Sequence, residues 1–395
     1  MLNGTRKRSR ARHASVCRVA LIPCVLVWVS ALASGCASSN LASARANFFL
    51  GRYDTAAASL IKEPKKDKDR VLFLMERGMI RQAAGAYTDS AHDWLDAHLL
   101  ADRLDYFSVS KQSTSMLIND SVLSFRGMSY ERSLLHAFAA KSYFALSLWD
   151  DAAVEARNNI GRLEQRGKYP DDPYSRYMNG FCLEMSGDRD GARVQYNVAN
   201  TLLGKSIVET TTGKIGACTV DGPTSPPAYT HELICFVGIG RPSFAPGAGT
   251  DRWRWGPRPY ARVRDSKGVL LGRSISLNTT DHLSLQTRDV NKVMRGVKTV
   301  TRIAVKEIAA EMLEDEYEFA GELLRVLLFA MEQPDNRRWQ TLPEWLQVVR
   351  VPCPADLDQF SLEFVGMDGR VVAKQTITTP VTKRGNAYVS FARAF

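Results

Sequence analysis

A short pattern of residues recurs along the first half of the chain and constrains the fold more than any other feature. Gly51, Tyr53 and Ala56 are echoed thirty-four residues later by Gly85, Tyr87 and Ser90, and looser copies lie at residues 148–152 and 187–192. A glycine permits a tight turn between two helices, the aromatic residue packs across the pair, and the small residue lets the next helix approach closely. Apolar residues at helical spacing and few prolines continue from position 41 to about 205. The sequence therefore predicts stacked helical hairpins over this region.

The interval of thirty-four residues resembles that of tetratricopeptide (TPR) repeats. The resemblance implies a TPR-like helical domain over residues 36–205, with a concave surface that is free for a partner helix or an extended peptide. Such an array favours binding over catalysis. The later intervals are irregular, and an irregular helical bundle built from the same turns is the alternative.

The N-terminal segment is predicted to direct secretion. Residues 1–18 are basic, and residues 19–33 form an apolar stretch of fifteen residues, which is too short to span a bilayer comfortably. Six of the chain's cations lie before position 36 without any acid among them, and without these six the formal charge falls from +10 to +4. The remaining charge is no signal for nucleic acid, which we do not expect as a partner.

The residues that end this apolar stretch resemble the lipobox of bacterial lipoproteins. Leu32 is followed by Ala33, Ser34, Gly35 and Cys36. The resemblance implies that residues 1–35 are a lipoprotein signal peptide and that Cys36 is lipidated and becomes the mature N-terminus. Ala33 stands where the family usually has Leu, and the absence of Asp after Cys36 implies sorting to the periplasmic face of the outer membrane. The alternative is an ordinary cleaved signal peptide with Cys36 as a free thiol.

Four further cysteines stay in the mature chain, in a compartment that permits disulfides. They are Cys182, Cys218, Cys235 and Cys353. We predict a disulfide between Cys218 and Cys235, which flank a loop rich in Pro and Thr, with four buried free thiols as the alternative. No pair has the CxxC spacing of a zinc site and no histidine completes a zinc pattern, so we expect no metal.

The second half has a different composition. Residues 206–230 are rich in Thr, Gly and Pro and are predicted as a linker, followed by an α+β domain over residues 231–395. Two helices are expected between 289 and 333, and alternating strands at 360–364, 371–377 and 387–395 predict an antiparallel sheet. The predicted architecture is thus multidomain: an N-terminal all-α TPR-like helical solenoid followed by a C-terminal α+β domain with an antiparallel sheet.

A loop in this second half is the candidate binding surface. Arg252, Trp253, Arg254 and Trp255 alternate cations with aromatic rings between glycines and prolines. These side chains could bind a glycan, lipid headgroups or an acidic segment of a partner, whereas core packing of the two tryptophans is the alternative. The chain lacks the GxSxG and HExxH motifs, and its partial glycine-rich motifs lack the context of nucleotide sites. We therefore predict no catalytic residue and no cofactor.

Several stretches together resemble a family of uncharacterised proteobacterial outer-membrane lipoproteins with a TPR-like N-terminal half. They lie at residues 75–80, 85–90, 130–132, 152–157 and 337–343. The resemblance implies an envelope role near peptidoglycan synthesis and carries over no catalytic residue. The predicted function is a non-enzymatic outer-membrane lipoprotein that binds an envelope protein partner as scaffold or activator. The alternative is an enzyme or binding module that acts on peptidoglycan or lipid through the C-terminal domain.

Overall fold

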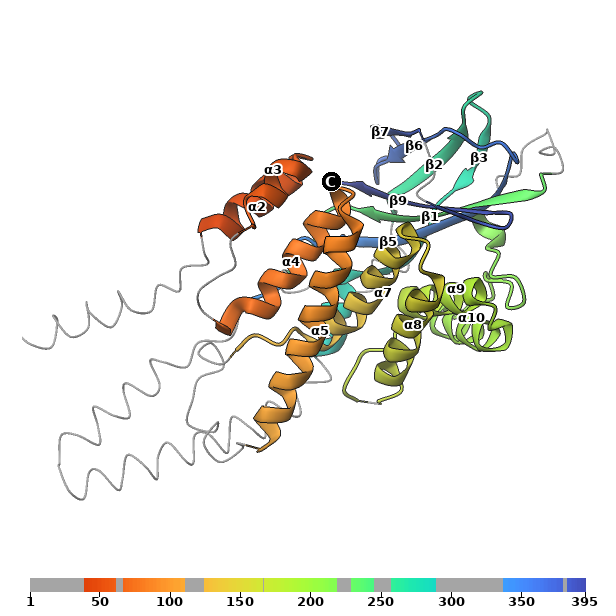
Figure 1. The fold of residues 1–395 in the computed structure, drawn as a ribbon. Coiled ribbons are helices and arrows are strands. Elements are labelled where there is room, and N and C mark those ends of the chain that lie inside the picture. The colour runs from red at the N-terminus through yellow and green to blue at the C-terminus, as the bar shows by residue number, and fades with distance from the viewer. Residues whose placement is uncertain are drawn as a thin grey trace, which may run out of the picture.

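The computed structural model describes residues 39–61, 67–110, 124–165, 167–218, 229–244, 257–288, 337–378 and 382–395 (Figure 1). Its N-terminal half is helical, as the sequence predicts. The helices are α2 (Ser39–Phe49), α3 (Tyr53–Ala58), α4 (Arg70–Ala83), α5 (Tyr87–Ser110), α7 (Ser129–Ala145), α8 (Trp149–Leu163), α9 (Pro173–Ser186) and α10 (Arg189–Leu203). In the described parts of the chain, no helix is both long enough and apolar enough to cross a membrane.

The helices form successive antiparallel pairs, and the turn and the small residues recur at the same positions in each pair. Each pair turns at a residue with positive φ: Gly51, Gly85, Ser147 or Gly187. Two small residues lie twelve positions apart, one on each helix of the pair: Ala44 and Ala56, Gly78 and Ser90, Ala140 and Ala152, Gly180 and Ala192. The alanines are buried, and the Ser90 hydroxyl donates to the carbonyl oxygen of Gly78 at 2.8 Å. The spacing is tight, because a Cβ atom added at Gly180 would lie 2.7 Å from the Tyr196 ring. The repeated pattern in the sequence therefore records where the paired helices touch.

The C-terminal half contains two sheets. One has the strand order β4 (Ile275–Thr279), β5 (Trp345–Cys353), β1 (His231–Ile239), β9 (Ala387–Ala394) and β8 (Thr382–Arg384). The other has the order β3 (Leu270–Arg273), β2 (Tyr260–Asp265), β6 (Phe360–Val365) and β7 (Val371–Ile377). Neighbouring strands are antiparallel except β1 and β9, which are parallel. The predicted strands of the tail and the antiparallel character of the sheets are confirmed, with this one parallel pair added.

The five-stranded sheet lies between the helices and the four-stranded sheet (Figure 1). Phe236 of β1 packs on Tyr177 and Phe181 of α9, with ring centroids 6.4 and 5.4 Å apart. Arg350 of β5 forms an ion pair with Glu184 of α9 at 2.7 Å. Buried apolar side chains from both halves form one continuous cluster. The helical array and the sheets therefore share a core.

Residues 206–218, the first described part of the predicted linker 206–230, are packed against this core. Val208 and Ile215 are buried and form an isolated antiparallel bridge. The Tyr177 hydroxyl donates to the carbonyl of Gly213 at 3.0 Å. This stretch therefore continues the fold between α10 and β1 and anchors itself to the core through a few buried residues.

The predicted disulfide between Cys218 and Cys235 is not formed. All four described cysteines are buried free thiols, which was the alternative. Cys235 lies in the central strand β1, whereas the thiol of Cys218 lies 3.7 Å from the carbonyl oxygen of Val348 in β5. Burial raises the pKa of Cys218 and of Cys235 to about 12, so both stay protonated. These thiols pack as small apolar side chains.

Candidate functional site

A segment of the C-terminal half, residues 337–343, lies along helices α4 and α7 of the array. The backbone N–H of Trp339 donates to Glu131 Oε1 at 2.8 Å, and that of Gln340 donates to Glu76 Oε1 at 2.8 Å. The guanidinium of Arg45 in α2 donates to Glu76 and to the carbonyl oxygen of Arg338. Two carboxylates on neighbouring helices thus hold the backbone of an extended segment.

The side chain of Trp339 anchors this segment. It is fully buried, with its ring centroid 5.2 Å from Trp94 and 5.7 Å from Phe138. Its indole N–H donates to the Thr341 hydroxyl at 3.0 Å. Aromatic contacts of this kind add to the free energy gained by burying the ring.

Glu131 performs two tasks in this arrangement. Its second carboxylate oxygen accepts the backbone N–H of Met128 at 2.7 Å and so caps helix α7. Burial raises the pKa of Glu131 to about 7, and the nearby Glu76 adds to this shift, whereas the backbone N–H donors of Trp339 and Met128 oppose it. The carboxylate form therefore depends on those two donors.

This arrangement corrects the prediction of a free concave surface. The array does hold an extended segment, but the segment at α4 and α7 belongs to the same chain. The sheet covers α9 in the same way through Phe236 and Arg350. The sequence could not place residues 337–343 here because almost three hundred positions separate Arg45 from Arg338.

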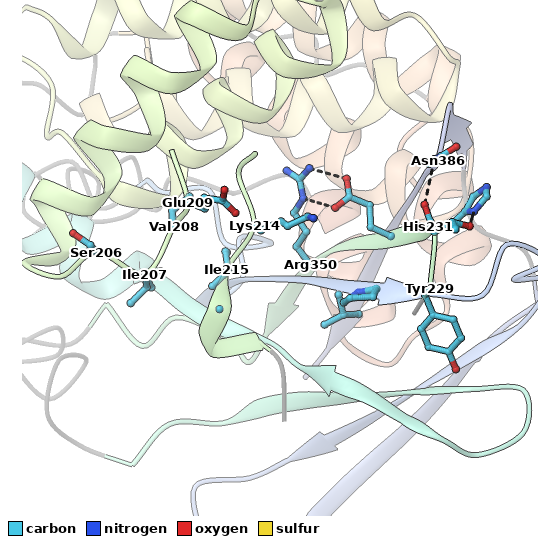
Figure 2. A pocket seen from close by; sticks show the side chains of 15 residues that line it. Ser206, Ile207, Val208, Glu209, Lys214, Ile215, Tyr229, His231, Arg350 and Asn386 are labelled. Carbon is cyan, nitrogen blue, oxygen red and sulfur yellow. Dashed lines mark hydrogen bonds and ion pairs between the residues drawn. The ribbon is translucent and has the colours of Figure 1, made fainter. Parts of the chain in front are cut away.

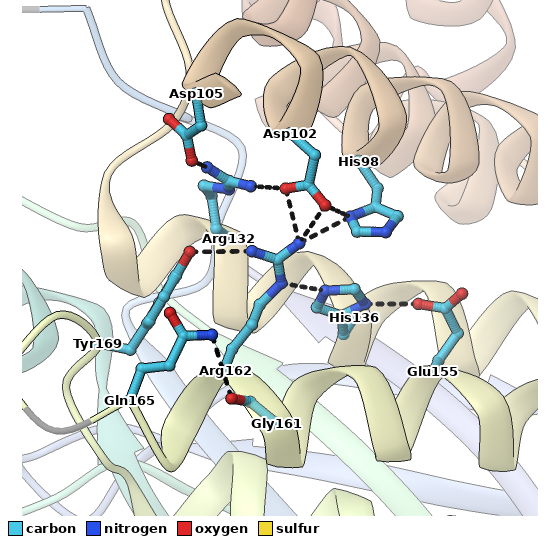
Figure 3. Close-up of polar contacts among 10 residues, drawn as sticks. All are labelled: His98, Asp102, Asp105, Arg132, His136, Glu155, Gly161, Arg162, Gln165 and Tyr169. Carbon is cyan, nitrogen blue, oxygen red and sulfur yellow. Dashed lines mark hydrogen bonds and ion pairs between the residues drawn. The ribbon is translucent and has the colours of Figure 1, made fainter. Parts of the chain in front are cut away.

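A second polar cluster ties together helices α5, α7 and α8 (Figure 3). Arg162 donates to both carboxylate oxygens of Asp102 at 2.8 and 2.9 Å, to His136 Nε2 at 2.9 Å and to the Tyr169 hydroxyl at 2.9 Å. Arg132 also pairs with Asp102. The buried part of this cluster thus centres on one guanidinium.

The two histidines of the cluster are held in fixed roles. Because His136 Nε2 accepts from Arg162, its Nδ1 carries the proton and donates to Glu155 at 2.6 Å. Burial, together with the neighbouring His136, lowers the pKa of His98 to about 4. The lone pair that a catalytic base would use on His136 is occupied by Arg162. The cluster therefore braces three helices.

A surface pocket of about 730 Å³ lies where residues 206–216 meet β1 and β5 (Figure 2). Its lining includes Glu209, Lys214, His231 and Arg350 beside apolar side chains. Arg350 is committed to two carboxylates, since it pairs with Glu184 and Glu232 at 2.7 Å each. The two hydroxyls of Thr211 and Thr212 lower the pKa of the exposed Glu209. The pocket is thus a largely apolar hollow whose main cation is already neutralised.

The residues proposed from the sequence for lipidation and surface binding lie outside the described residues. They are Cys36 and the loop residues Arg252, Trp253, Arg254 and Trp255. The two helices expected between 289 and 333 also lie outside them. Within the described ranges, no group of three His, Cys, Asp or Glu side chains could hold a metal ion.

Comparison with known proteins identifies no family. No family model and no curated protein matches the chain. Among solved structures, the chain is similar to a thermophilic TPR protein from Thermus thermophilus. The identity is 16%, the match covers 42% of this chain and 91% of that chain, and the TM-score is 0.20. The fold class accordingly rests on the helix pairs and sheets themselves.

Proposed function

We propose that this chain is a non-enzymatic lipoprotein of a bacterial outer membrane that binds an envelope protein partner as scaffold or activator, in or near peptidoglycan synthesis. The apolar segment that ends in the lipobox-like residues before Cys36 supports the anchor. A tether at Cys36 would keep the helical array close to the membrane surface, where envelope assemblies work. The basic region before Cys36 would leave with the signal peptide.

The observation that carries the binding role is the segment at residues 337–343. Its backbone and its Trp339 anchor are held by Glu76, Glu131 and an aromatic pocket, so helices of this array can hold an extended segment. The inner face of the array, formed here by α4 and α7, is occupied by this segment. The partner surface that we propose is therefore the outer face, formed by α5, α8 and α10. Apolar side chains are exposed there on α5, α8 and α10, namely Leu95, Leu99, Val154 and Val194.

Site-specific photocrosslinking in cells tests this proposal. A photoreactive residue at Leu99 or Val154, which are each half exposed, should capture a discrete envelope protein. The matched control carries the same residue at Lys374, which is 57% exposed on strand β7 of the far sheet. Equal capture from Lys374 would contradict the assigned surface.

The Cys36→Ala variant tests the anchor separately. We expect loss of metabolic fatty-acid labelling and loss of the crosslinked product, because the array would no longer be held at the membrane. An unchanged fatty-acid signal would refute lipidation at Cys36. Capture of peptidoglycan fragments alone would refute the protein scaffold and favour a wall-binding module.

A further inference from the structure

A second cavity, of about 120 Å³ and partly open to the surface, lies between the helices and the five-stranded sheet. Its walls come from α2, α3, α4, α5, α7, β1, β7 and β9 together with Pro343. The rings of Phe48, Phe138, Phe236 and Phe391 make much of it apolar. Two cations, Lys141 and Arg393, line it as well, and none of its fifteen lining residues is acidic. The cavity is therefore both aromatic and positively charged.

Lys141 lacks an anionic partner among the described residues. Its side chain leaves α7, and the residue is only 5% exposed. The ammonium Nζ lies 4.1 Å from the centroid of the Phe138 ring and 5.8 Å from that of Phe236. Ring faces attract a cation, but they do not replace the hydrogen bonds of water or of a carboxylate.

Arg393 of β9 is only partly satisfied. Its Nη2 donates to the carbonyl oxygens of Thr341 and Leu342 at 3.1 and 2.9 Å. Its Nε is buried and has no hydrogen-bond partner. Burial lowers the pKa of Arg393 to about 9, and burial together with the charge of Arg393 lowers the pKa of Lys141 to about 7. Each cation thus raises the cost of keeping the other charged.

We propose that this cavity binds a small organic carboxylate. The carboxylate would accept a hydrogen bond from Lys141, would lie beside the guanidinium of Arg393 and would neutralise part of the excess charge. A short hydrocarbon tail would lie against Phe138, Phe236 and Met79, which line the same space. This role is separate from the proposed partner surface on α5, α8 and α10.

Carboxylate binding would be linked to the protonation of Lys141. The titratable groups that face Lys141 from the other elements are Tyr53, Tyr87, Tyr174, Cys235 and Arg393. Burial raises the pKa of each of the tyrosines and of Cys235, so these groups stay neutral between pH 6 and 8. Above pH 7 the site must therefore take up a proton at Lys141 when the carboxylate binds.

Isothermal titration calorimetry with the full chain in detergent tests the proposal, with butyrate as the probe. We expect butyrate to bind at pH 6.5, to bind more weakly at pH 8.5, and to take up a proton at pH 8, seen as a heat that depends on the buffer. The Lys141→Met variant keeps the shape of the side chain and should lose about tenfold or more in affinity. Lys205→Met, at an exposed lysine beyond α10, should bind as the wild type does.

Four other results would contradict the proposed carboxylate site or one of its features. Absence of butyrate binding to the wild type refutes the site. Equal affinity for butyramide shows that charge does not matter, and equal affinity for inorganic phosphate refutes the organic class of ligand. Unchanged butyrate affinity in a folded Lys141→Met variant, verified by circular dichroism, refutes the role of Lys141.

Discussion

Replacing Lys141 with methionine should stabilise the protein at low pH. The pKa of Lys141 falls from 10.5 to about 7 in the folded state, chiefly through burial. The folded protein therefore binds fewer protons than the unfolded chain between pH 7 and 10.5, and the free energy of unfolding rises with pH across that window. Below pH 7 the buried charge costs its full amount, about 4 to 5 kcal/mol at one pKa unit per 1.36 kcal/mol.

Methionine recovers most of this cost without leaving a cavity. It loses the attraction between the ammonium and the Phe138 ring, which is about 1 to 2 kcal/mol for a buried pair. The variant should therefore be about 2 to 4 kcal/mol more stable than the wild type at pH 6, and this advantage should shrink by about 2 to 3 kcal/mol at pH 9.

Urea unfolding of the non-lipidated chain, followed by circular dichroism at pH 6 and pH 9, measures both values. Lys205→Met is the matched control, because Lys205 is exposed and its charge stays in water. A variant that is less stable than the wild type at pH 6 would refute the argument. So would an advantage of equal size at both pH values, because the linkage to Lys141 requires the difference to change.

The remaining predictions concern packing. Trp339→Ala should lower the free energy of unfolding by about 3 to 5 kcal/mol and expose residues 337–343 to limited proteolysis, because the ring fills the pocket between Trp94 and Phe138. Gly180→Ala should destabilise α9, since the new Cβ would lie 2.7 Å from Tyr196, whereas Gly161→Ala in α8 meets nothing within 4 Å and should stabilise by about 0.5 to 1 kcal/mol in the same urea assay. The buried free thiols should react with a thiol reagent only after the protein is unfolded, in the absence of reductant; they are Cys182, Cys218, Cys235 and Cys353. Reaction of fewer than these four thiols in the unfolded chain would reveal a disulfide.

Features set by local spacing were predicted from the sequence. The pattern at Gly51 and Gly85 predicted helical pairs because a residue with positive φ and a small residue at a fixed distance are local requirements of the turn. The alternation at residues 360–364 and 371–377 predicted β6 and β7 for the same reason. The helical turns and the strand pair are each determined by residues that are close together in the sequence.

Features set by distant contacts were missed. His136 is isolated in the sequence, yet its partners Glu155 and Arg162 come from the next helix at spacings that are ordinary for any helix pair. Glu76 and Lys141 also gave no signal, because their burial depends on chain that returns from the C-terminal half. Nothing local in residues 337–343 indicated that the tryptophan packs between Trp94 and Phe138.

The segment at residues 337–343 determines how the two halves can act. Its backbone N–H groups donate to Glu76 and Glu131, two buried carboxylates that also accept from Arg45 and from the N–H of Met128. Its last residues supply the carbonyl oxygens that hold Arg393 at the wall of the aromatic cavity. A partner that displaced this segment would have to replace the contacts of both carboxylates and of Arg393 at once. The inner face of the array is therefore a structural joint between helices and sheet, which is why the partner surface that we propose is the outward face of α5, α8 and α10.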